Sequence, residues 1–259
     1  MIAFSALTQT NGRTANSTRR RKPDITPWAL TMLTSDAQVY HEQFGLMITL
    51  PRLYPILDTE SLDRRGIPLP TAAAAFLEGG AGILQVRHKR HWSRAVFESA
   101  GEVARLCREA GSALFVNDRA DFALLLHAGL HIGQDDLPPR EARKLMGSDA
   151  AIGFSSHPAR QLCESGGEPI DYLAIGPVFT TVSKRNPDPV VGVEEVRRCR
   201  ALVDKPLVAI GGVTRQNAAD VLRAGADAVA VIADLLPEEA TARSLRERME
   251  EWQQLVKAA

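Results

Sequence analysis

The sequence has few cysteines, no excess of either charge and no long apolar run. Each of these absences argues against a class of protein. Cys107, Cys163 and Cys199 form no C-x-x-C pair, so we interpret them as reduced structural cysteines of a cytoplasmic protein. The formal net charge is zero, which gives no overall field to attract nucleic acid or a membrane surface. No apolar run reaches the roughly 18 residues that a membrane-spanning helix needs.

Size and composition favour one large domain. The 259 residues are 45% hydrophobic and 24% charged, and single α/β barrels are commonly about 250 residues long. The first 23 residues hold five basic side chains and no acidic one. This leader resembles an organelle transit peptide, but we favour a poorly ordered tail or a start at Met47. We therefore expect an N-terminal extension over residues 1–46 and one folded domain over residues 47–259.

From residue 50 onward, short apolar runs alternate with segments of helical periodicity. The runs are nearly continuous, as is typical of strands buried on both faces. They lie at residues 53–57, 82–86, 113–116, 130–132, 151–154, 172–175, 207–210 and 228–232. The helical segments lie at residues 70–78, 93–109, 118–127, 138–146, 158–164, 193–202, 215–224 and 237–257.

Eight strand–helix units in succession predict a (β/α)₈ TIM barrel for residues 47–259. A doubly wound open sheet is the alternative, but the sequence lacks the glycine-rich dinucleotide fingerprint common in such sheets. Catalytic groups of (β/α)₈ barrels lie on the loops after the strands. Polar residues should therefore follow the apolar runs directly.

The second strand ends in alternating polar residues. Gln85, Arg87 and Lys89 follow one another at a spacing of two, which points their side chains to one face. Two cations and an amide on one face at the mouth of a barrel suit a polyanion such as a diphosphate. The alternative is a run of charged residues on a solvated loop. We favour it less, because the polar residues alternate directly after a buried strand.

Carboxylates follow the next two strands. Asn117 and Asp118 come directly after the third run, and Asp135 and Asp136 come shortly after the fourth. Because neighbouring parallel strands end at the same edge, Asp118 and Asp136 can face one hard cation such as Mg²⁺. Asp118 as a helix N-cap, and Asp135 and Asp136 as ordinary turn residues, are the alternatives.

The remaining strand ends carry groups suited to phosphate. Ser155 directly follows the fifth strand, where its hydroxyl can bond a phosphate oxygen, although the adjacent residues 156 and 157 fit a helix cap equally well. A long loop after the sixth strand contains Thr181, Ser183 and Lys184, and we expect it to close as a lid. Glycines after strand seven and a helix start after strand eight match the usual phosphate site of such barrels.

These motifs together resemble the thiamine phosphate synthase family. The resemblance covers residues 53–236 in order, and the combined set is specific although no single motif is. The segments that carry it are Gln85-Val86-Arg87-His88-Lys89, Asn117-Asp118-Arg119, His131-Ile132-Gly133-Gln134-Asp135-Asp136, Gly153-Phe154-Ser155-Ser156-His157, the loop from Gly176 to Lys184, and Ile210-Gly211-Gly212-Val213-Thr214.

The resemblance implies an Mg²⁺-dependent transferase that acts on small phosphorylated substrates. Such enzymes join 4-amino-2-methyl-5-hydroxymethylpyrimidine diphosphate to 4-methyl-5-(2-hydroxyethyl)thiazole phosphate. It implies Asp118 and Asp136 as Mg²⁺ ligands, and Lys89, Ser155 and Lys184 as catalytic residues. The substrate-binding residues that it implies are Gln85, Arg87, Lys89, Asn117, Ser155 and Lys184 for the diphosphate substrate, and Thr181, Ser183, Gly212, Ile232 and Ala233 for the thiazole phosphate.

The chain departs from the family pattern at a few positions. His88 stands where the family usually has an acid, Ser183 where it has threonine, and Ala233 where it often has serine. The resemblance also suggests self-association, without indicating an interface. Two other functions stay open at this point. One is a related thiazole tautomerase, which needs no diphosphate site, and the other is a non-catalytic phosphate-binding regulator.

Overall fold

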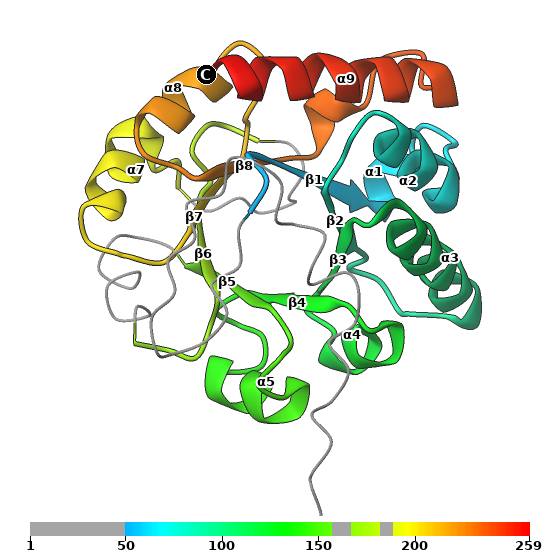
Figure 1. Ribbon diagram of the computed structural model, residues 1–259, viewed down its shortest axis with the longest axis horizontal. Coiled ribbons are helices and arrows are strands. Elements are labelled where there is room, and N and C mark those ends of the chain that lie inside the picture. Colours follow the sequence, from blue (N-terminus) through cyan, green and yellow to red (C-terminus); the bar gives the residue numbers. More distant parts are fainter. Residues whose placement is uncertain (1–49, 157–166, 182–188) are drawn as a thin grey trace, which may run out of the picture.

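The chain folds into a closed barrel of parallel strands surrounded by helices (Figure 1). The computed structural model describes residues 50–156, 167–181 and 189–259. Within them, eight strands pair in chain order, and β8 pairs with β1 to close the barrel. The strands are β1 (Leu53–Asp58), β2 (Ile83–Arg87), β3 (Ala113–Asn117), β4 (Gly129–Ile132), β5 (Ile152–Ser156), β6 (Tyr172–Ile175), β7 (Leu207–Ile210) and β8 (Ala228–Val231). The predicted (β/α)₈ barrel is therefore confirmed.

The helices pack around the outside of this barrel (Figure 1). Those described are α1 (Thr59–Asp63), α2 (Leu69–Glu78), α3 (Arg94–Ala110), α4 (Ala120–Leu126), α5 (Pro139–Met146), α7 (Gly192–Arg200), α8 (Ala218–Arg223), the 3₁₀ helix η2 (Ala233–Leu235) and α9 (Ala242–Ala258). The helix predicted for residues 158–164 lies outside the described residues. None of the helices in the described ranges is both long enough and apolar enough to cross a membrane.

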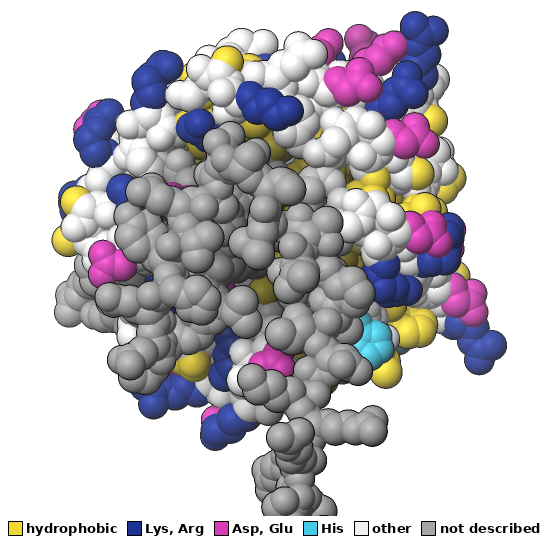
Figure 2. Space-filling model, viewed as in Figure 1, with side chains coloured by type: hydrophobic (Ala, Val, Ile, Leu, Met, Phe, Trp, Pro, Cys, Tyr) yellow, Lys and Arg dark blue, Asp and Glu magenta, His cyan; other side chains and the backbone are white. Residues whose placement is uncertain are grey.

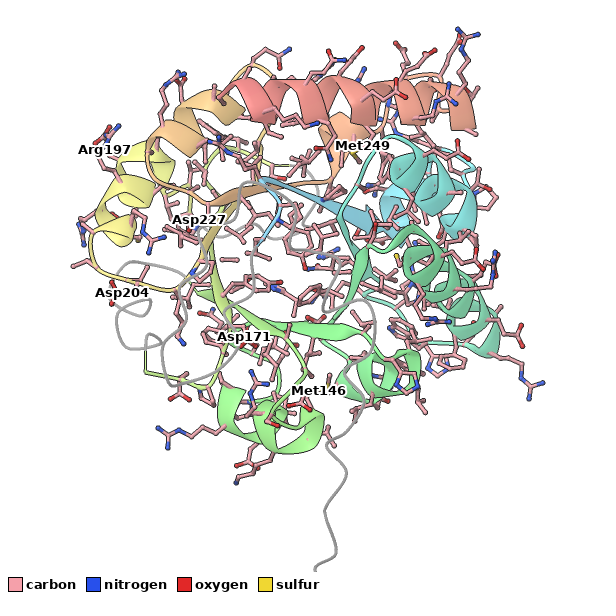
Figure 3. All side chains as sticks on the ribbon, in the orientation of Figure 1. Met146, Asp171, Arg197, Asp204, Asp227 and Met249 are labelled. Carbon is pink, nitrogen blue, oxygen red and sulfur yellow. The ribbon has the colours of Figure 1, made fainter. Side chains whose placement is uncertain are left out.

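Two apolar layers hold the barrel together. The larger one lies between the strands and the helices, where Met249 of α9 packs toward α2 (Figure 3). The smaller one fills the inside of the barrel and includes Tyr54, Phe115 and Tyr172, whose rings meet edge to face. Gly153 makes room for this layer, because a Cβ there would lie 2.0 Å from Cζ of Tyr172.

Charged side chains of both signs are spread over the outer helices (Figure 2). Arg197 of α7, for example, projects from the outside of the molecule, where its side chain is 57% exposed (Figure 3). This mixture of positive and negative side chains agrees with the zero formal net charge of the sequence.

Two predicted helix starts were wrong, and side-chain hydrogen bonds explain both. The last helix begins at Ala242 rather than at residue 237, because Thr241 and Ser244 form a reciprocal capping box. The helix after β7 begins at Ala218 rather than at residue 215. There the Asn217 side chain accepts from the Thr214 N–H and donates to the Gly212 carbonyl, which holds a turn before the helix.

Candidate active site at the mouth of the barrel

The C-terminal ends of the strands open into one cavity of about 800 Å³. Nearly all the site residues predicted from the sequence line it. These are Gln85, Arg87, Lys89, Asn117, Asp118, Asp136, Ser155, Thr181, Gly212, Ile232 and Ala233. The two others, Ser183 and Lys184, lie outside the described residues. The barrel thus brings together side chains that lie far apart in the sequence, from Gln85 to Ala233.

The carboxyl groups of Asp118 and Asp136 both line this cavity, and they lie close enough for Asp136 to raise the pKa of Asp118. Asp118 follows β3 with φ of +65°, and its N–H donates to the His131 carbonyl of β4 at 2.7 Å. Asp136 is held by the Gly133 N–H, which donates to its Oδ2 at 2.7 Å. The helix α4 begins at Ala120, preceded by Arg119, so Asp118 does not act as its N-cap.

Burial raises the pKa of Asp118, and the neighbouring Asp136 carboxyl raises it too; with Lys89 opposing both effects, the pKa is about 6. Two carboxylates this close repel each other unless a proton or a cation lies between them. No group of three or more histidine, cysteine or acidic side chains suited to a metal occurs in the described part of the chain. Two carboxylate groups are a ligand set that suits Mg²⁺, which takes few protein oxygens and keeps sites for water and phosphate.

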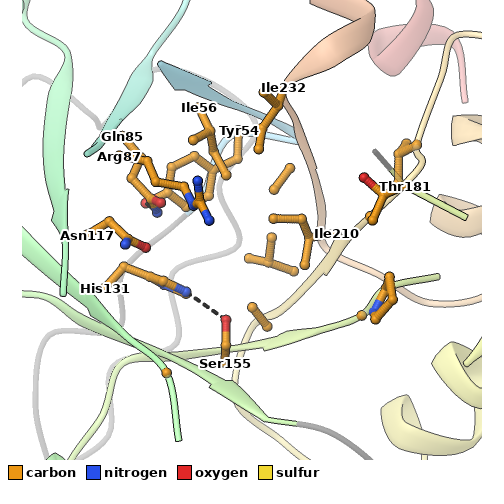
Figure 4. A pocket seen from close by; sticks show the side chains of 18 of the residues that line it. Tyr54, Ile56, Gln85, Arg87, Asn117, His131, Ser155, Thr181, Ile210 and Ile232 are labelled. Carbon is orange, nitrogen blue, oxygen red and sulfur yellow. Dashed lines mark hydrogen bonds between the residues drawn. The ribbon is translucent and has the colours of Figure 1, made fainter. Parts of the chain in front are cut away.

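Two cations line the same cavity as these carboxylates. The Lys89 Nζ lies 2.5 Å from Oδ2 of Asp118, and its side chain is 46% exposed. The Arg87 Nη1 lies 2.5 Å from Oδ2 of Asp58, and its side chain is 12% exposed. Arg87 extends into the cavity beside Gln85 (Figure 4). A phosphorylated ligand in the cavity would thus meet one fixed and one more accessible cation.

A chain of polar side chains crosses the floor of the cavity (Figure 4). Gln85 Nε2 donates to the Tyr54 hydroxyl at 3.2 Å, and that hydroxyl lies 3.0 Å from the Tyr172 hydroxyl. His131 bridges the Tyr172 hydroxyl and the Ser155 Oγ, each at 2.8 Å. Burial raises the pKa of both tyrosines, so both hydroxyls keep their protons.

The buried amide of Asn117 has a hydrogen-bond donor without a partner among the described residues, which suggests a ligand contact. Its side chain lines the cavity and is 6% exposed, yet its Nδ2 has no hydrogen-bond partner among the described residues. An unsatisfied buried donor costs about 1–3 kcal/mol. A bound ligand with an acceptor beside Asn117 would remove that penalty.

A backbone turn on the other side of the cavity comes from the loops after β6 and β7. The Val178 and Phe179 N–H groups donate to the carbonyls of Ile210 and Gly211, each at 2.9 Å. Gly212 has φ of +63°, and a Cβ there would lie 2.4 Å from the Thr180 carbonyl oxygen. This close approach requires glycine and leaves the backbone exposed to the cavity.

The turn after β8 completes this side. Ile232 and Ala233 line the cavity as η2 begins. The Asp234 carboxylate accepts from Arg215 Nε at 3.0 Å and from Trp252 Nε1 at 2.9 Å. These bonds tie the turn to α9 and to the loop before α8, so its backbone N–H groups have a fixed position for an anion.

A family model described as thiamine monophosphate synthase matches residues 53–235. The chain belongs to this family. It is 45% identical over 196 residues to a thiamine-phosphate synthase of Koribacter versatilis, which covers 73% of this chain and 90% of that protein. A thiamine-phosphate synthase of Chloroflexus aurantiacus is 40% identical over 199 residues, 75% of this chain and 91% of that one. A solved thiamine phosphate pyrophosphorylase of Pyrococcus furiosus aligns with TM-score 0.69 and 31% identity, over 80% of this chain and 96% of that chain.

Two departures from the pattern of the thiamine monophosphate synthase family can now be placed. His88 is buried and does not line the cavity, because its ring contacts the Thr59 hydroxyl at 2.7 Å and the His91 carbonyl at 3.2 Å. Its replacement of an acid therefore leaves the cavity wall unchanged. Ala233 does line the cavity, so this wall presents a methyl group and backbone rather than a hydroxyl.

Sequence reasoning assigned no role to Asp58, Tyr54, His131 or Tyr172. The three aromatic residues occupy strand positions, where the pattern was taken only as a buried run. Each of these side chains carries a polar atom within an apolar run. Because strand positions two apart face the same side, that atom was the available sign that the side chain points into the barrel. Asp58 ends β1 as Arg87 ends β2, and the two are paired in register.

Proposed function

We propose that the protein forms thiamine phosphate and diphosphate from 4-amino-2-methyl-5-hydroxymethylpyrimidine diphosphate and 4-methyl-5-(2-hydroxyethyl)thiazole phosphate. The observation that carries the proposal is one cavity with a carboxylate pair, two cations and a glycine turn, in a chain 45% identical to a thiamine-phosphate synthase. It is a transferase, because a pyrimidinylmethyl group passes from diphosphate to the thiazole nitrogen.

Asp118 and Asp136 would hold Mg²⁺, and Arg87, Lys89 and Lys184 would bind the diphosphate. The bound ion would supply positive charge to the leaving group, in the way that divalent ions assist phosphate departure. Lys89 has a further part: its ion pair with Asp118 holds the ammonium beside the carboxylate pair. From there, Lys89 reaches the diphosphate when that group enters.

The reaction proceeds by dissociative substitution and needs no protein nucleophile. The carbon–oxygen bond to diphosphate breaks, and the electron-rich aminopyrimidine stabilises the carbon cation that remains. The thiazole nitrogen then gives its electron pair to that carbon, and no proton is transferred. The protein contributes position, fixed charge and exclusion of water.

Asn117 and the polar side chains on the floor of the cavity would orient the pyrimidine. The unpaired Nδ2 of Asn117 donates to the substrate, and Gln85 lies beside it with its amide already fixed by Tyr54. Ser155, held by His131, faces the departing diphosphate. Because these groups are placed before the substrate arrives, little reorganisation accompanies the reaction.

The thiazole phosphate would bind on the opposite wall. Backbone N–H groups of Gly212 and of the turn at Ile232 and Ala233 donate to its phosphate, joined by the hydroxyls of Thr181 and Ser183. With alanine at position 233, this contact depends more on backbone donors than it does with serine there. We also propose a cytoplasmic location, in keeping with the buried free thiols of Cys107 and Cys199.

The test is a turnover assay with both substrates and Mg²⁺, in which thiamine phosphate is detected by chromatography. We expect product that depends on the metal, and absence of product at every Mg²⁺ concentration would reject the proposal. Asp118→Ala and Asp136→Ala should lower turnover by about 100-fold or more while the fold survives. A thiazole tautomerase would instead be active without Mg²⁺ and would tolerate both substitutions.

A further inference from the structure

Asp58 is a buried carboxylate beside the cavity that the proposed function does not use. It ends β1 and is 3% exposed. Its Oδ1 accepts from the Ser61 N–H at 2.9 Å and from the Ser61 Oγ at 2.7 Å, and so caps α1. Its Oδ2 accepts from Arg87 Nη1 at 2.5 Å. The two oxygens thus have separate tasks, and Ser61 holds the one that does not bind arginine.

Arg87 depends on this contact for its orientation. Asp58 is the acceptor that its guanidinium contacts within the described residues, and the rest of the side chain lines the cavity. A guanidinium has five N–H donors, so the donors not used by Asp58 are left for a ligand. Without a partner, an arginine side chain has rotamer freedom that binding must remove.

We propose that Asp58 is a positioning residue, which fixes the Arg87 guanidinium in the orientation that binds the departing diphosphate. This inference rests on the proposed function and goes beyond it, because Asp58 touches neither substrate nor metal. Donors that are fixed in advance stabilise the charge that develops in the transition state more than they stabilise the bound substrate.

The charge of Asp58 has the opposite effect on substrate binding. A carboxylate so close to Arg87 weakens the attraction of the cavity for a polyanion. Orientation and charge therefore act on different kinetic constants. Removal of the charge should lower kcat, because Arg87 loses its charge-assisted bond, and should leave KM for the diphosphate substrate equal or lower.

Asp58→Asn is the variant that separates these effects. Asparagine keeps an acceptor for the Ser61 N–H, so the cap of α1 survives. We expect kcat to fall by about 10-fold to 100-fold, with KM for the pyrimidine diphosphate unchanged or lower. An unchanged kcat, or a higher KM with kcat intact, would overturn the proposal.

A double-mutant cycle with Arg87→Gln tests whether Asp58 acts through Arg87. In the Arg87→Gln background, Asp58→Asn should change kcat by less than about 2-fold, because the group that it positions is gone. Equal effects of Asp58→Asn in both backgrounds would refute positioning.

Asp171→Asn is the matched control. Asp171 forms the same kind of pair with Arg143 at 2.7 Å, but it lies before β6, at the opposite end of the barrel. We expect a lower melting temperature and unchanged kcat and KM for this variant. If it lowered kcat as much as Asp58→Asn does, a general loss of stability would explain both, and the proposal would fail. A wild-type protein without turnover would instead reject the proposed function itself.

Discussion

At the scale of single residues, the paired carboxyl groups of Asp118 and Asp136 predict a dependence on pH. The folded protein raises the pKa of Asp118 to about 6, so it binds a proton that the unfolded chain has released. This group therefore contributes stability that is full below about pH 4 and is lost as the pH rises through about 6. In the proposed function the ionised pair holds Mg²⁺, and the ion should then offset that loss.

We expect Mg²⁺ to raise the melting temperature by several degrees at about pH 7.5 and by little at about pH 5. Thermal unfolding at both pH values, with and without the ion, measures this. In Asp118→Asn the metal-dependent rise should disappear at either pH. An equal rise at both pH values in the wild type would contradict the assignment of the metal to this pair.

Single residues also show the limit of prediction from sequence. Asp118 and Asp136 were predicted as metal ligands because each follows an apolar run and belongs to a segment that resembles a family motif. Tyr54 and Tyr172 belong to apolar runs themselves, and the inside of a barrel is not distinguishable from a core in such a run. Asp58 and Arg87 are 29 positions apart in the chain, so only the register of β1 and β2 reveals their contact.

At the scale of elements, the glycine turn after β7 predicts a specific sensitivity to added side chains. Gly212 and Gly66 have nearly the same φ, +63° and +64°, but a Cβ meets the Thr180 carbonyl at Gly212 and nothing within 4 Å at Gly66. Alanine at φ above zero costs about 1 kcal/mol in either place. The steric contact should add to this at Gly212 alone.

Gly66→Ala should therefore lower the free energy of unfolding by about 1 kcal/mol, and Gly212→Ala by about 3 kcal/mol. Denaturant unfolding measures both. Gly212→Ala should also raise KM for the thiazole phosphate, whereas Gly66→Ala should not. Equal losses of stability in the two variants would mean that the turn can open without affecting the barrel.

At the N-terminal ends of the strands, opposite the cavity, two aspartates form similar clamps, each of which binds a backbone N–H and an arginine. Asp227 accepts from the Leu207 N–H and from Arg200, each at 2.7 Å (Figure 3). Asp171 accepts in the same way from the Ile152 N–H at 2.6 Å and from Arg143 at 2.7 Å. Each aspartate comes just before one strand and binds the first residues of the strand before it. Each clamp therefore joins two consecutive β/α units.

Asp227→Asn should lower the free energy of unfolding by about 1 kcal/mol, because a charge-assisted bond becomes a neutral one. Turnover at saturating substrate should be unchanged, since this clamp is far from the C-terminal strand ends. A loss of kcat with the stability intact would show that the two ends of the barrel are coupled.

Element boundaries were predicted less well than element types. Apolar runs marked all the strands to within two residues, because a strand buried on both faces has few polar interruptions. The helix starts after β7 and β8 depend on the turn that the Asn217 side chain holds and on the side-chain cap at Thr241. Asparagine and threonine are common in loops as well as at caps, so the pattern alone did not locate them.

At the scale of the whole molecule, the barrel explains why distant motifs form one site. Closure from β8 to β1 places the turns after the last two strands in the same cavity as the cations of the second strand. The alternation of strands and helices made this architecture predictable, because short connections and a parallel sheet leave few other topologies. The lid proposed for residues around Ser183 and Lys184 lies outside the described residues.

The most direct test of the account is a crystal structure with diphosphate and Mn²⁺, which prefers oxygen ligands as Mg²⁺ does and is located by anomalous scattering. The account predicts one strong anomalous peak bonded to a carboxylate oxygen of Asp118, a carboxylate oxygen of Asp136 and the diphosphate, and no such peak in Asp136→Ala. A peak elsewhere in the molecule, or none between these two carboxylates, would contradict the central claim that they share a divalent ion at the mouth of the barrel.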